Sequence, residues 1–150
     1  KSVMPGLVLT SDVIIGFPGE TEAEAMDTVS LVEEVGFDAL FTFIYSPRPG
    51  TKAAAMPDPA TRAEKQKWFD KLLEVQNANS AKLHAAYVGK TVRVLVDGES
   101  DDENFPLASR TEGNRLVRLK GDKSLIGSFI DVKITDSNTW RCTASRCDIP

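Results

Sequence analysis

A glycine-rich turn near the start of the chain is the first place where the sequence could bind a ligand. The turn, Gly16-Phe17-Pro18-Gly19-Glu20, follows the β-branched run Val13-Ile14-Ile15, which predicts a strand buried on both faces. Thr21 and Glu24 have capping-box spacing, so a helix is predicted directly after the turn. Parallel α/β folds place ligands beside such turns, where backbone N–H groups are free. A capped turn without any ligand explains the same pattern.

A second candidate segment follows the next apolar run. Residues 39–44 predict another buried strand, and Arg48 stands between Pro47 and Pro49, which restrict the backbone on both sides. In a parallel sheet this segment and the glycine turn lie at the same carboxyl edge. We therefore expect Arg48 to project near the turn, with an ordinary surface arginine as the alternative.

Basic side chains are concentrated in the last third of the chain. The net charge is −4, but residues 1–60 carry three basic and nine acidic side chains, whereas residues 89–150 carry ten of each. Five of those acids lie in one stretch, residues 97–103, predicted to be a loop, and without it the segment is basic by five. A basic surface on an acidic chain indicates a polyanion partner, although solvated surface is the alternative. The candidate residues for phosphate or base contacts are Arg110, Thr111, Asn114, Arg118 and Lys120.

Residues suited to metal binding or nucleophilic chemistry are sparse. Cys142 and Cys147 are five residues apart, which matches neither a disulfide framework nor a zinc knuckle, so we predict ordinary thiols of a cytosolic protein and no metal site. His84 has no neighbouring Cys or His and is predicted to be structural or exposed. No apolar run reaches membrane-spanning length, and we interpret the sequence, which begins without Met, as a piece of a longer protein.

Hydrophobic periodicity divides the chain into residues 1–88 and 89–150. The first part predicts a β-α-β unit with parallel strands and then a long helix from Asp58 or Thr61, which polar residues 76–80 could interrupt and Gly89 would end. From Lys90 the period changes from about 3.6 to 2, which predicts four or five short strands in an OB-like antiparallel barrel. The expected fold class is therefore α/β plus all-β.

Six segments resemble, in the same order, the signatures of the radical S-adenosylmethionine methylthiotransferases of the tRNA type (MiaB-type). These segments are residues 12–21, 41–51, 73–77, 88–92, 109–114 and 125–127. The resemblance implies that residues 1–88 form the last βα units of an open, TIM-like radical-SAM barrel with a linking helix. It also implies that residues 89–150 form a TRAM domain, an OB-like RNA-binding barrel.

The resemblance implies an enzyme that adds a methylthio group to C2 of N6-isopentenyladenosine beside the tRNA anticodon. Such enzymes use S-adenosylmethionine and two [4Fe-4S] clusters, and the radical-SAM cluster is held by a Cys-x3-Cys-x2-Cys run. This sequence has no such run. We therefore expect the cluster ligands outside this chain, no catalytic residue within it, and no activity from this piece alone.

The family pattern places the two candidate segments of the first part near the adenine and ribose of S-adenosylmethionine. Ile14 with Phe43 or Tyr45 would pack on the adenine, and backbone amides near Gly16 would meet its polar edge. The expected cofactor-binding residues are Ile14, Gly16, Phe17, Pro18, Gly19, Glu20, Phe43, Tyr45 and Arg48.

In the second part, the resemblance implies a face that binds a tRNA anticodon stem-loop. Its expected residues are the five candidates Arg110, Thr111, Asn114, Arg118 and Lys120. The expected protein is cytoplasmic, and the sequence does not indicate its oligomeric state. Two alternatives remain open. One is a related methylthiotransferase acting on a ribosomal protein, whose last domain should be acidic rather than basic. The other is a non-catalytic RNA-binding adaptor with the β-α-β part as a scaffold.

Overall fold

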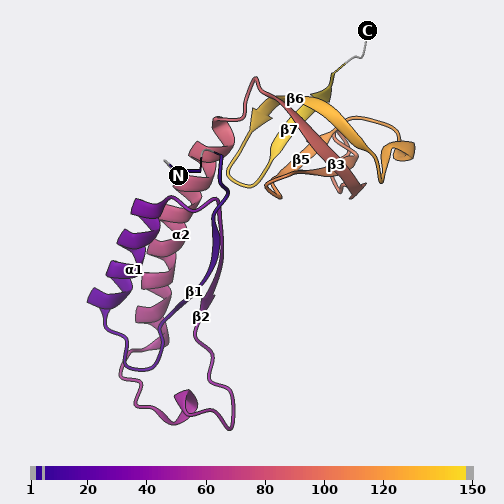
Figure 1. Cartoon of the computed structure of the whole chain (residues 1–150). Helices are drawn as coiled ribbons and strands as arrows, with labels where there is room; N and C mark the ends of the chain where they lie inside the picture. The colour runs from indigo at the N-terminus through magenta and orange to yellow at the C-terminus, as the bar shows by residue number, and fades with distance from the viewer. Residues whose placement is uncertain (1–2, 5, 148–150) are drawn as a thin grey trace. The chain divides into compact units, whose positions relative to one another are not determined.

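The computed structural model of the chain describes residues 3–4 and 6–147 (Figure 1). It forms two compact units, one of residues Val8–Asn79 and the other of residues from Ser80 onward, and each is described by itself. The elements of the chain are, in order, β1 (Thr10–Ile15), α1 (Glu22–Val35), β2 (Ala39–Ile44), a 3₁₀ turn (Ala53–Ala55), α2 (Arg62–Ala85), β3 (Thr91–Glu99), β4 (Leu107–Thr111), β5 (Leu116–Leu119), a second 3₁₀ turn (Lys123–Leu125), β6 (Phe129–Ser137) and β7 (Cys142–Arg146).

The first unit contains the predicted β-α-β arrangement. β1 and β2 pair in parallel, with Ile14 opposite Phe43, and α1 connects them. The predicted capping box is confirmed, because Thr21 accepts the Glu24 N–H and the Glu24 carboxylate accepts the Thr21 N–H. Gly36 ends the helix in the left-handed conformation, at φ 61°, as predicted.

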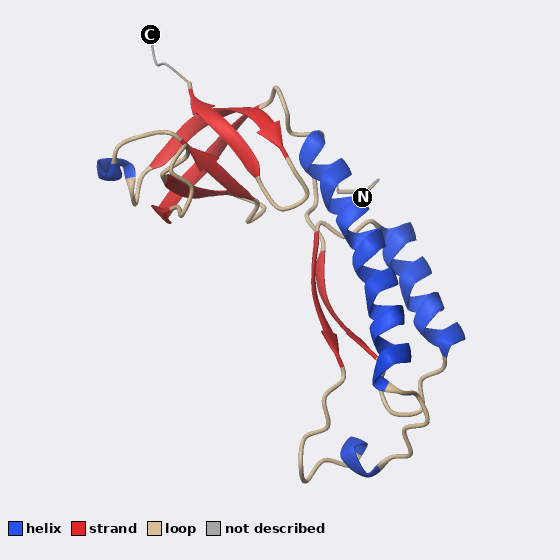
Figure 2. Ribbon diagram, turned by 180° about the vertical axis from the view of Figure 1, so that it is seen from behind, coloured by secondary structure: helices blue, strands red, loops and turns tan. Residues whose placement is uncertain are grey.

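Only one face of the β1–β2 sheet is covered by the residues that the structure describes. α1 and α2 lie side by side on that face (Figure 2) and form a core that contains Ile15, Val32 and Leu72. On the other face Ile14 and Phe43 are about half exposed, at 54% and 55%. The expectation that this strand is buried on both faces is therefore wrong for the chain as described, and its continuous apolar run leaves one apolar face open.

Helix α2 runs without the interruption that its polar residues had suggested. Gln76 donates to the carbonyl oxygen of Phe37 at 3.2 Å, and Asn79 donates to that of Val32 at 3.1 Å. The polar side chains thus satisfy carbonyl groups at and just beyond the end of α1 instead of breaking their own helix. The helix also ends earlier than predicted, at Ala85, while the Gly89 N–H donates to Ile134 in the barrel.

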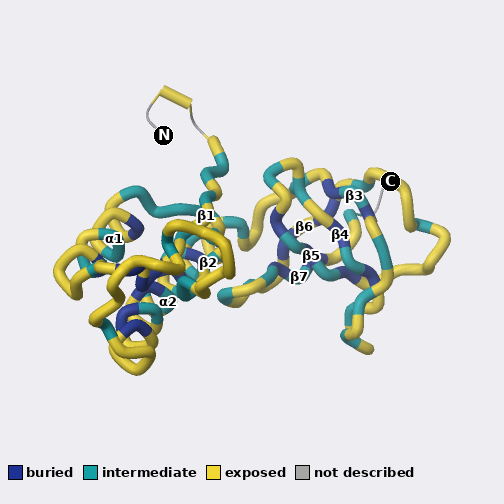
Figure 3. Tube along the Cα trace, turned by 90° about the horizontal axis from the view of Figure 1, so that it is seen from below, coloured by how far each residue is buried: buried dark blue, intermediate teal, exposed yellow. Residues whose placement is uncertain are grey.

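The second unit is the predicted small barrel, with five strands closed in the order β3-β4-β5-β7-β6. All pairs are antiparallel except β5 with β7. Alternate residues fill its interior, and Figure 3 shows these buried positions along the strands. The fully buried interior residues are Val94, Val96, Leu107, Val117, Leu119, Val132, Ile134, Cys142 and Ala144.

Two details of the barrel differ from the sequence pattern. The acidic stretch is not wholly a loop, since β3 continues through Asp97 to Glu99 past a bulge between Val96 and Gly98. Trp140, which the alternation grouped with Cys142, is 69% exposed, because Asn138 holds its N–H in a tight turn before β7 begins.

Candidate functional site

The loops after β1 and β2 meet at the carboxyl edge of the sheet, as predicted. The Tyr45 N–H continues the strand pairing by donating to Ile15 at 2.8 Å. The rings of Phe17 and Tyr45 are in edge contact, with centroids 5.2 Å apart. A turn of Arg48, Pro49, Gly50 and Thr51 follows, closed by the Thr51 N–H on the Arg48 oxygen with Gly50 at φ 84°.

An open cavity of about 480 Å³ lies against this edge. Four of the predicted cofactor-binding residues line it, namely Ile14, Phe43, Tyr45 and Arg48, together with Ile44, Ser46, Thr51 and Ala53. Its volume is within the range of small-molecule sites, and exposed apolar side chains beside a few polar groups are the usual lining of such sites. The structure thus brings together residues from both candidate segments.

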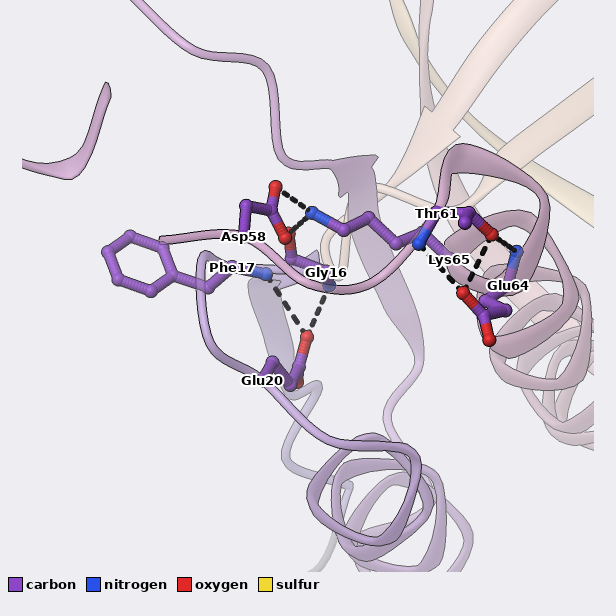
Figure 4. A network of polar contacts seen from close by, with 7 residues as sticks. All are labelled: Gly16, Phe17, Glu20, Asp58, Thr61, Glu64 and Lys65. Atoms are coloured by element: carbon purple, nitrogen blue, oxygen red, sulfur yellow. Dashed lines mark hydrogen bonds and ion pairs between the residues drawn. The ribbon is translucent and has the colours of Figure 1, made fainter. Parts of the chain in front are cut away.

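The glycine turn is organised by Glu20, whose carboxylate accepts the backbone N–H groups of Gly16 and Phe17 (Figure 4). An adenine edge that met these two amides would have to compete with the Glu20 carboxylate, and this contact stays a prediction. Gly16 and Gly19 both have positive φ, at 77° and 86°, so glycine is required by the turn itself. Pro18 is buried, and the exposed residues of this turn are Phe17 and Gly19.

Lys65 of α2 binds the glycine turn through the Gly16 carbonyl oxygen. This residue was not identified from the sequence. Its side chain is buried, and its ammonium group donates to the Gly16 oxygen at 2.7 Å and to Asp58 at 2.5 Å. The ammonium nitrogen also lies 6.0 Å from the centre of the Tyr45 ring. The capping box of Thr61 and Glu64 predicts that α2 starts here, but nothing local indicates that the next residue points inward.

The residues at the cavity fit the adenosine part of S-adenosylmethionine. Ile14 and Phe43 offer apolar surface to a planar ring, and the buried Tyr45 hydroxyl has no hydrogen-bond partner among the described residues. A ligand with polar ring edges could supply that partner. The described residues offer no comparable site for an iron-sulfur cluster. Nowhere among them do three His, Cys, Asp or Glu side chains come together as metal ligands.

On the barrel, the predicted RNA-binding residues lie on two adjacent strands and beside them. Arg110 and Thr111 are on β4, Asn114 is in the turn between β4 and β5, Arg118 is on β5, and Lys120 follows β5. Asn114 has φ 59° and, with Thr111, closes the turn between the strands: the Asn114 N–H donates to the Thr111 oxygen, and the Thr111 hydroxyl accepts the Arg115 N–H. Lys120 is exposed, with its ammonium 5.8 Å from the centre of the Phe105 ring.

The acidic side chains of residues 97–103 form ion pairs with this basic surface. The net positive charge obtained by leaving that stretch out therefore does not describe the barrel. Asp101 binds the guanidinium group of Arg118, and this contact holds the pKa of the Asp101 carboxyl below its ordinary value. The other ion pairs of the stretch are Asp97 with Arg110 at 3.0 Å, Glu99 with Lys123 at 2.9 Å and Asp102 with Arg141 at 2.8 Å. The barrel face is therefore a paired surface of both charges rather than a purely basic one.

The two cysteines and the histidine were the candidates for metal binding or nucleophilic chemistry. Both cysteines are free, and burial in the barrel raises the pKa of the Cys142 thiol. His84 is buried with Nδ1 2.8 Å from the Ser80 oxygen, so of the two predicted alternatives, structural or exposed, it is the structural one. Among the described helices, none combines the length and apolar character needed to span a membrane.

Residues 85–145 match the TRAM domain family. The chain is 49% identical over 140 residues to the tRNA-2-methylthio-N(6)-dimethylallyladenosine synthase of Oceanobacillus iheyensis, which covers 93% of this chain and 27% of that protein. The proteins of the same name from Thermoanaerobacter sp. and Bacillus cytotoxicus are 46% and 45% identical, over 93% and 100% of this chain and 30% of each relative. The chain thus spans about three tenths of the length of these relatives.

Among solved structures, the chain resembles the RNase R of Mycoplasma genitalium, determined in its apo form and in complex with ribose-methylated single-stranded RNA. The TM-score is 0.36 with 15% identity, covering 64% of this chain and 18% of that one. A similarity of this size carries no argument about fold or function.

Proposed function

The chain belongs to the tRNA-2-methylthio-N6-dimethylallyladenosine synthase family, with a TRAM domain at residues 85–145, and from this premise we propose that it supplies two parts of a radical-SAM tRNA methylthiotransferase. The barrel would bind the tRNA, and the β-α-β unit would form part of the cofactor wall. The observation that carries the proposal is the 45–49% identity over 93–100% of the chain, which extends through both units. The names of these relatives favour tRNA over a ribosomal protein as the substrate. A cytoplasmic location belongs to the same proposal.

The RNA-binding role rests on the barrel topology and its cations. Five-stranded OB-like barrels bind oligonucleotides on the face of their second and third strands, which here are β4 and β5. Arg110 and Arg118 project from these strands, and Lys120 follows β5 directly. Lys120 makes no ion pair with any described residue, so its charge is available to an RNA phosphate without displacing a carboxylate.

The cofactor role rests on the cavity at the carboxyl edge of the sheet. Ile14 and Phe43 would pack against the adenine, while the Tyr45 hydroxyl would bind a polar atom of the nucleoside. Arg48, at the rim, would hold the charged end of the ligand. Bound S-adenosylmethionine would supply the reactive adenosyl and methyl groups, and the ligands of both [4Fe-4S] clusters would come from outside this chain.

RNA binding is tested by titrating the 150-residue chain with a tRNA anticodon stem-loop at several salt concentrations. Lys120→Glu should weaken binding and lower the slope of log affinity against log salt by about 0.7–0.9, the value for one phosphate contact. Lys71→Glu, an exposed lysine of α2, is the matched control and should change the slope less. An unchanged affinity for Lys120→Glu would remove this residue from the RNA face.

The cofactor role is tested in a full-length methylthiotransferase that carries this segment. Phe43→Ala should weaken S-adenosylmethionine binding, measured by equilibrium dialysis, because Phe43 lines the cavity. Phe41→Ala is the control, since Phe41 lies on the same exposed face at 65% exposure but is not part of the lining. Equal losses for the two variants would contradict the proposed adenine contact and indicate a general defect of the sheet.

A further inference from the structure

An exposed aromatic ring and an arginine lie together on the outside of the barrel. Phe129, at the start of β6, is 61% exposed, although it belongs to a strand whose alternate residues are fully buried. The guanidinium carbon of Arg93, on β3, lies 5.0 Å from the centre of the Phe129 ring. This distance corresponds to a cation–π contact, which holds the ring and the charge in a fixed arrangement on the surface.

Strand register connects this pair to the proposed RNA face. Phe129 on β6 is opposite Leu95 on β3, and Leu95 is in turn opposite Arg110 on β4. The three residues form one outward row across adjacent strands. Because neighbouring strands are about 4.8 Å apart, the backbone of Phe129 is about 10 Å from that of Arg110. The aromatic residue therefore extends the surface of Arg110 and does not form a separate patch.

The charge of Arg93 is less neutralised than that of Arg110 on β4 or Arg118 on β5. Arg110 and Arg118 are bound by carboxylates of the acidic stretch. Arg93 is exposed, and although Asp131 stands opposite it in register, no ion pair joins Arg93 to any carboxylate in the described part of the chain. A phosphate can therefore approach Arg93 without first displacing a protein carboxylate.

We propose that Phe129 and Arg93 form a stacking platform for an unpaired RNA base, which continues the RNA face from β4 across β3 to β6. The inference rests on the proposed RNA-binding function. The base lies on the Phe129 ring, and a flanking phosphate binds the Arg93 guanidinium group. Proteins that recognise single-stranded loops use this combination, because every base has a π face and every nucleotide has a phosphate. The platform therefore favours looped over fully paired RNA.

The test compares two RNAs and five variants, one of them a control, in the 150-residue chain. One RNA is an anticodon stem-loop with 2-aminopurine in the loop, and the other is the same stem as a blunt duplex. Phe129→Ala should weaken stem-loop binding at least about fivefold, as expected for the loss of one stacked base, without changing the salt slope. Phe129→Leu keeps apolar bulk but lacks a π face, so it should weaken binding as well. Phe129→Trp should retain affinity and quench the 2-aminopurine emission.

Arg93→Gln separates the charge from the stacking. It should lower the salt slope by about 0.7–0.9, since one phosphate contact is lost, whereas the Phe129 variants leave the slope unchanged. Ile126→Ala, at another exposed apolar residue of the barrel, is the matched control and should bind normally. Thermal unfolding of each variant verifies that the barrel is intact.

Three results would overturn the proposal. Native affinity of both Phe129→Ala and Phe129→Leu for the stem-loop would show that no base stacks there. Equal weakening of duplex and stem-loop binding would show that the ring does not recognise an unpaired base, and would leave a protein partner as the reason for its exposure. If the native chain fails to bind either RNA, the proposed function fails together with this inference, whereas native binding with unaffected Phe129 variants removes the inference alone.

Discussion

The ammonium nitrogen of Lys65 lies 2.7 Å from the carbonyl oxygen of Gly16, a residue 49 positions earlier in the chain. The same ammonium group pairs with Asp58 at 2.5 Å, and the lysine side chain is only 7% exposed. One buried cation therefore joins the turn after β1, the segment before α2 and the first turn of that helix (Figure 4). This contact therefore ties the glycine turn at the carboxyl edge of the sheet to the start of α2.

Replacing Lys65 with Met should destabilise the unit of residues 8–79. The substitution keeps the apolar stem but leaves the Gly16 oxygen and the Asp58 carboxylate without their donor, which costs about 1–3 kcal/mol in the free energy of unfolding. Urea unfolding measures this change. Lys71→Met removes an exposed pair with Glu74 and should cost less than about 1 kcal/mol. Similar costs for the two variants would contradict a structural role of the buried pair.

The two glycines of the turn should differ in their tolerance of a side chain. Both have positive φ, and adopting the left-handed region costs a residue with a Cβ atom about 1–2 kcal/mol. A Cβ atom at Gly16 would lie 2.6 Å from Cδ of Lys65, whereas one at Gly19 would meet nothing within 4 Å. Gly16→Ala should therefore destabilise the protein by about 1–3 kcal/mol more than Gly19→Ala, as judged by urea unfolding. Equal costs would mean that Lys65 can move aside.

The same geometry limits how a Gly16 substitution can be interpreted. A bulkier residue there disturbs Lys65 and the fold, so lost cofactor binding in such a variant does not demonstrate a direct contact. Phe43, on the exposed face of the sheet, is the better position for that test.

The carboxylates of the two capping boxes, Glu24 and Glu64, make the stability of the folded protein depend on pH in the acidic range. Thr61 hydrogen bonds lower the pKa of the Glu64 carboxyl from its ordinary 4.5, and Thr21 does the same for Glu24. Because the folded-state pKa is depressed, the stabilisation is fully present above pH 4.5 and is lost as the pH falls through the folded value. Glu64→Gln keeps an acceptor oxygen but does not titrate. Its stability deficit relative to the native chain should therefore be present at about pH 7 and shrink at about pH 3.

Chemical denaturation at the two pH values measures this deficit. Glu33→Gln is the control, because Glu33 lies near the end of α1 and does not cap a helix. A deficit for Glu64→Gln that is the same at both pH values would contradict the assignment of the pH dependence to the cap.

Features that depend on local sequence were predicted correctly. The capping boxes at Thr21 and Thr61 and the Gly36 helix end rest on interactions between residues close together in the chain. The barrel strands pair with distant segments, but the period-2 alternation that predicts each of them is a local pattern. The shared edge of the β1 and β2 loops was also predictable, because parallel strands constrain where their loops lie.

Features that depend on long-range pairing were not predictable. The sequence contains Lys65 and Gly16 but no sign that they meet, and the polar Gln76 and Asn79 gave no sign that they satisfy carbonyl groups near the end of another helix. Phe129 was not singled out from the sequence, and only the strand pairing and the side-chain contact show that it lies beside Arg93. The acidic stretch was misjudged for the same reason, since its partners on β4 and β5 come later in the chain.

That acidic stretch leads to the last prediction, which concerns the strength of RNA binding. Asp97 and Asp101 bind Arg110 and Arg118, two cations of the proposed RNA face. An RNA phosphate must compete with these carboxylates, because each guanidinium group offers a limited number of donors. The double variant Asp97→Asn with Asp101→Asn should therefore bind the anticodon stem-loop several-fold more tightly at low salt, with a salt slope steeper by about 0.7–0.9 for each arginine that gains a phosphate.

The control must separate this local competition from a general change in net charge. Glu33→Gln with Glu34→Gln removes the same number of negative charges from α1, where no predicted RNA-binding residue lies. A change in net charge alone would strengthen binding in both double variants, and this effect would fade as salt is added, because exposed charges are screened beyond about 8–10 Å already at roughly 0.10–0.15 M salt. Tighter binding that is specific to the Asp97 and Asp101 variant and retains its steeper slope would show that the barrel's own carboxylates occupy the phosphate sites, whereas identical behaviour of the two variants would rule this out.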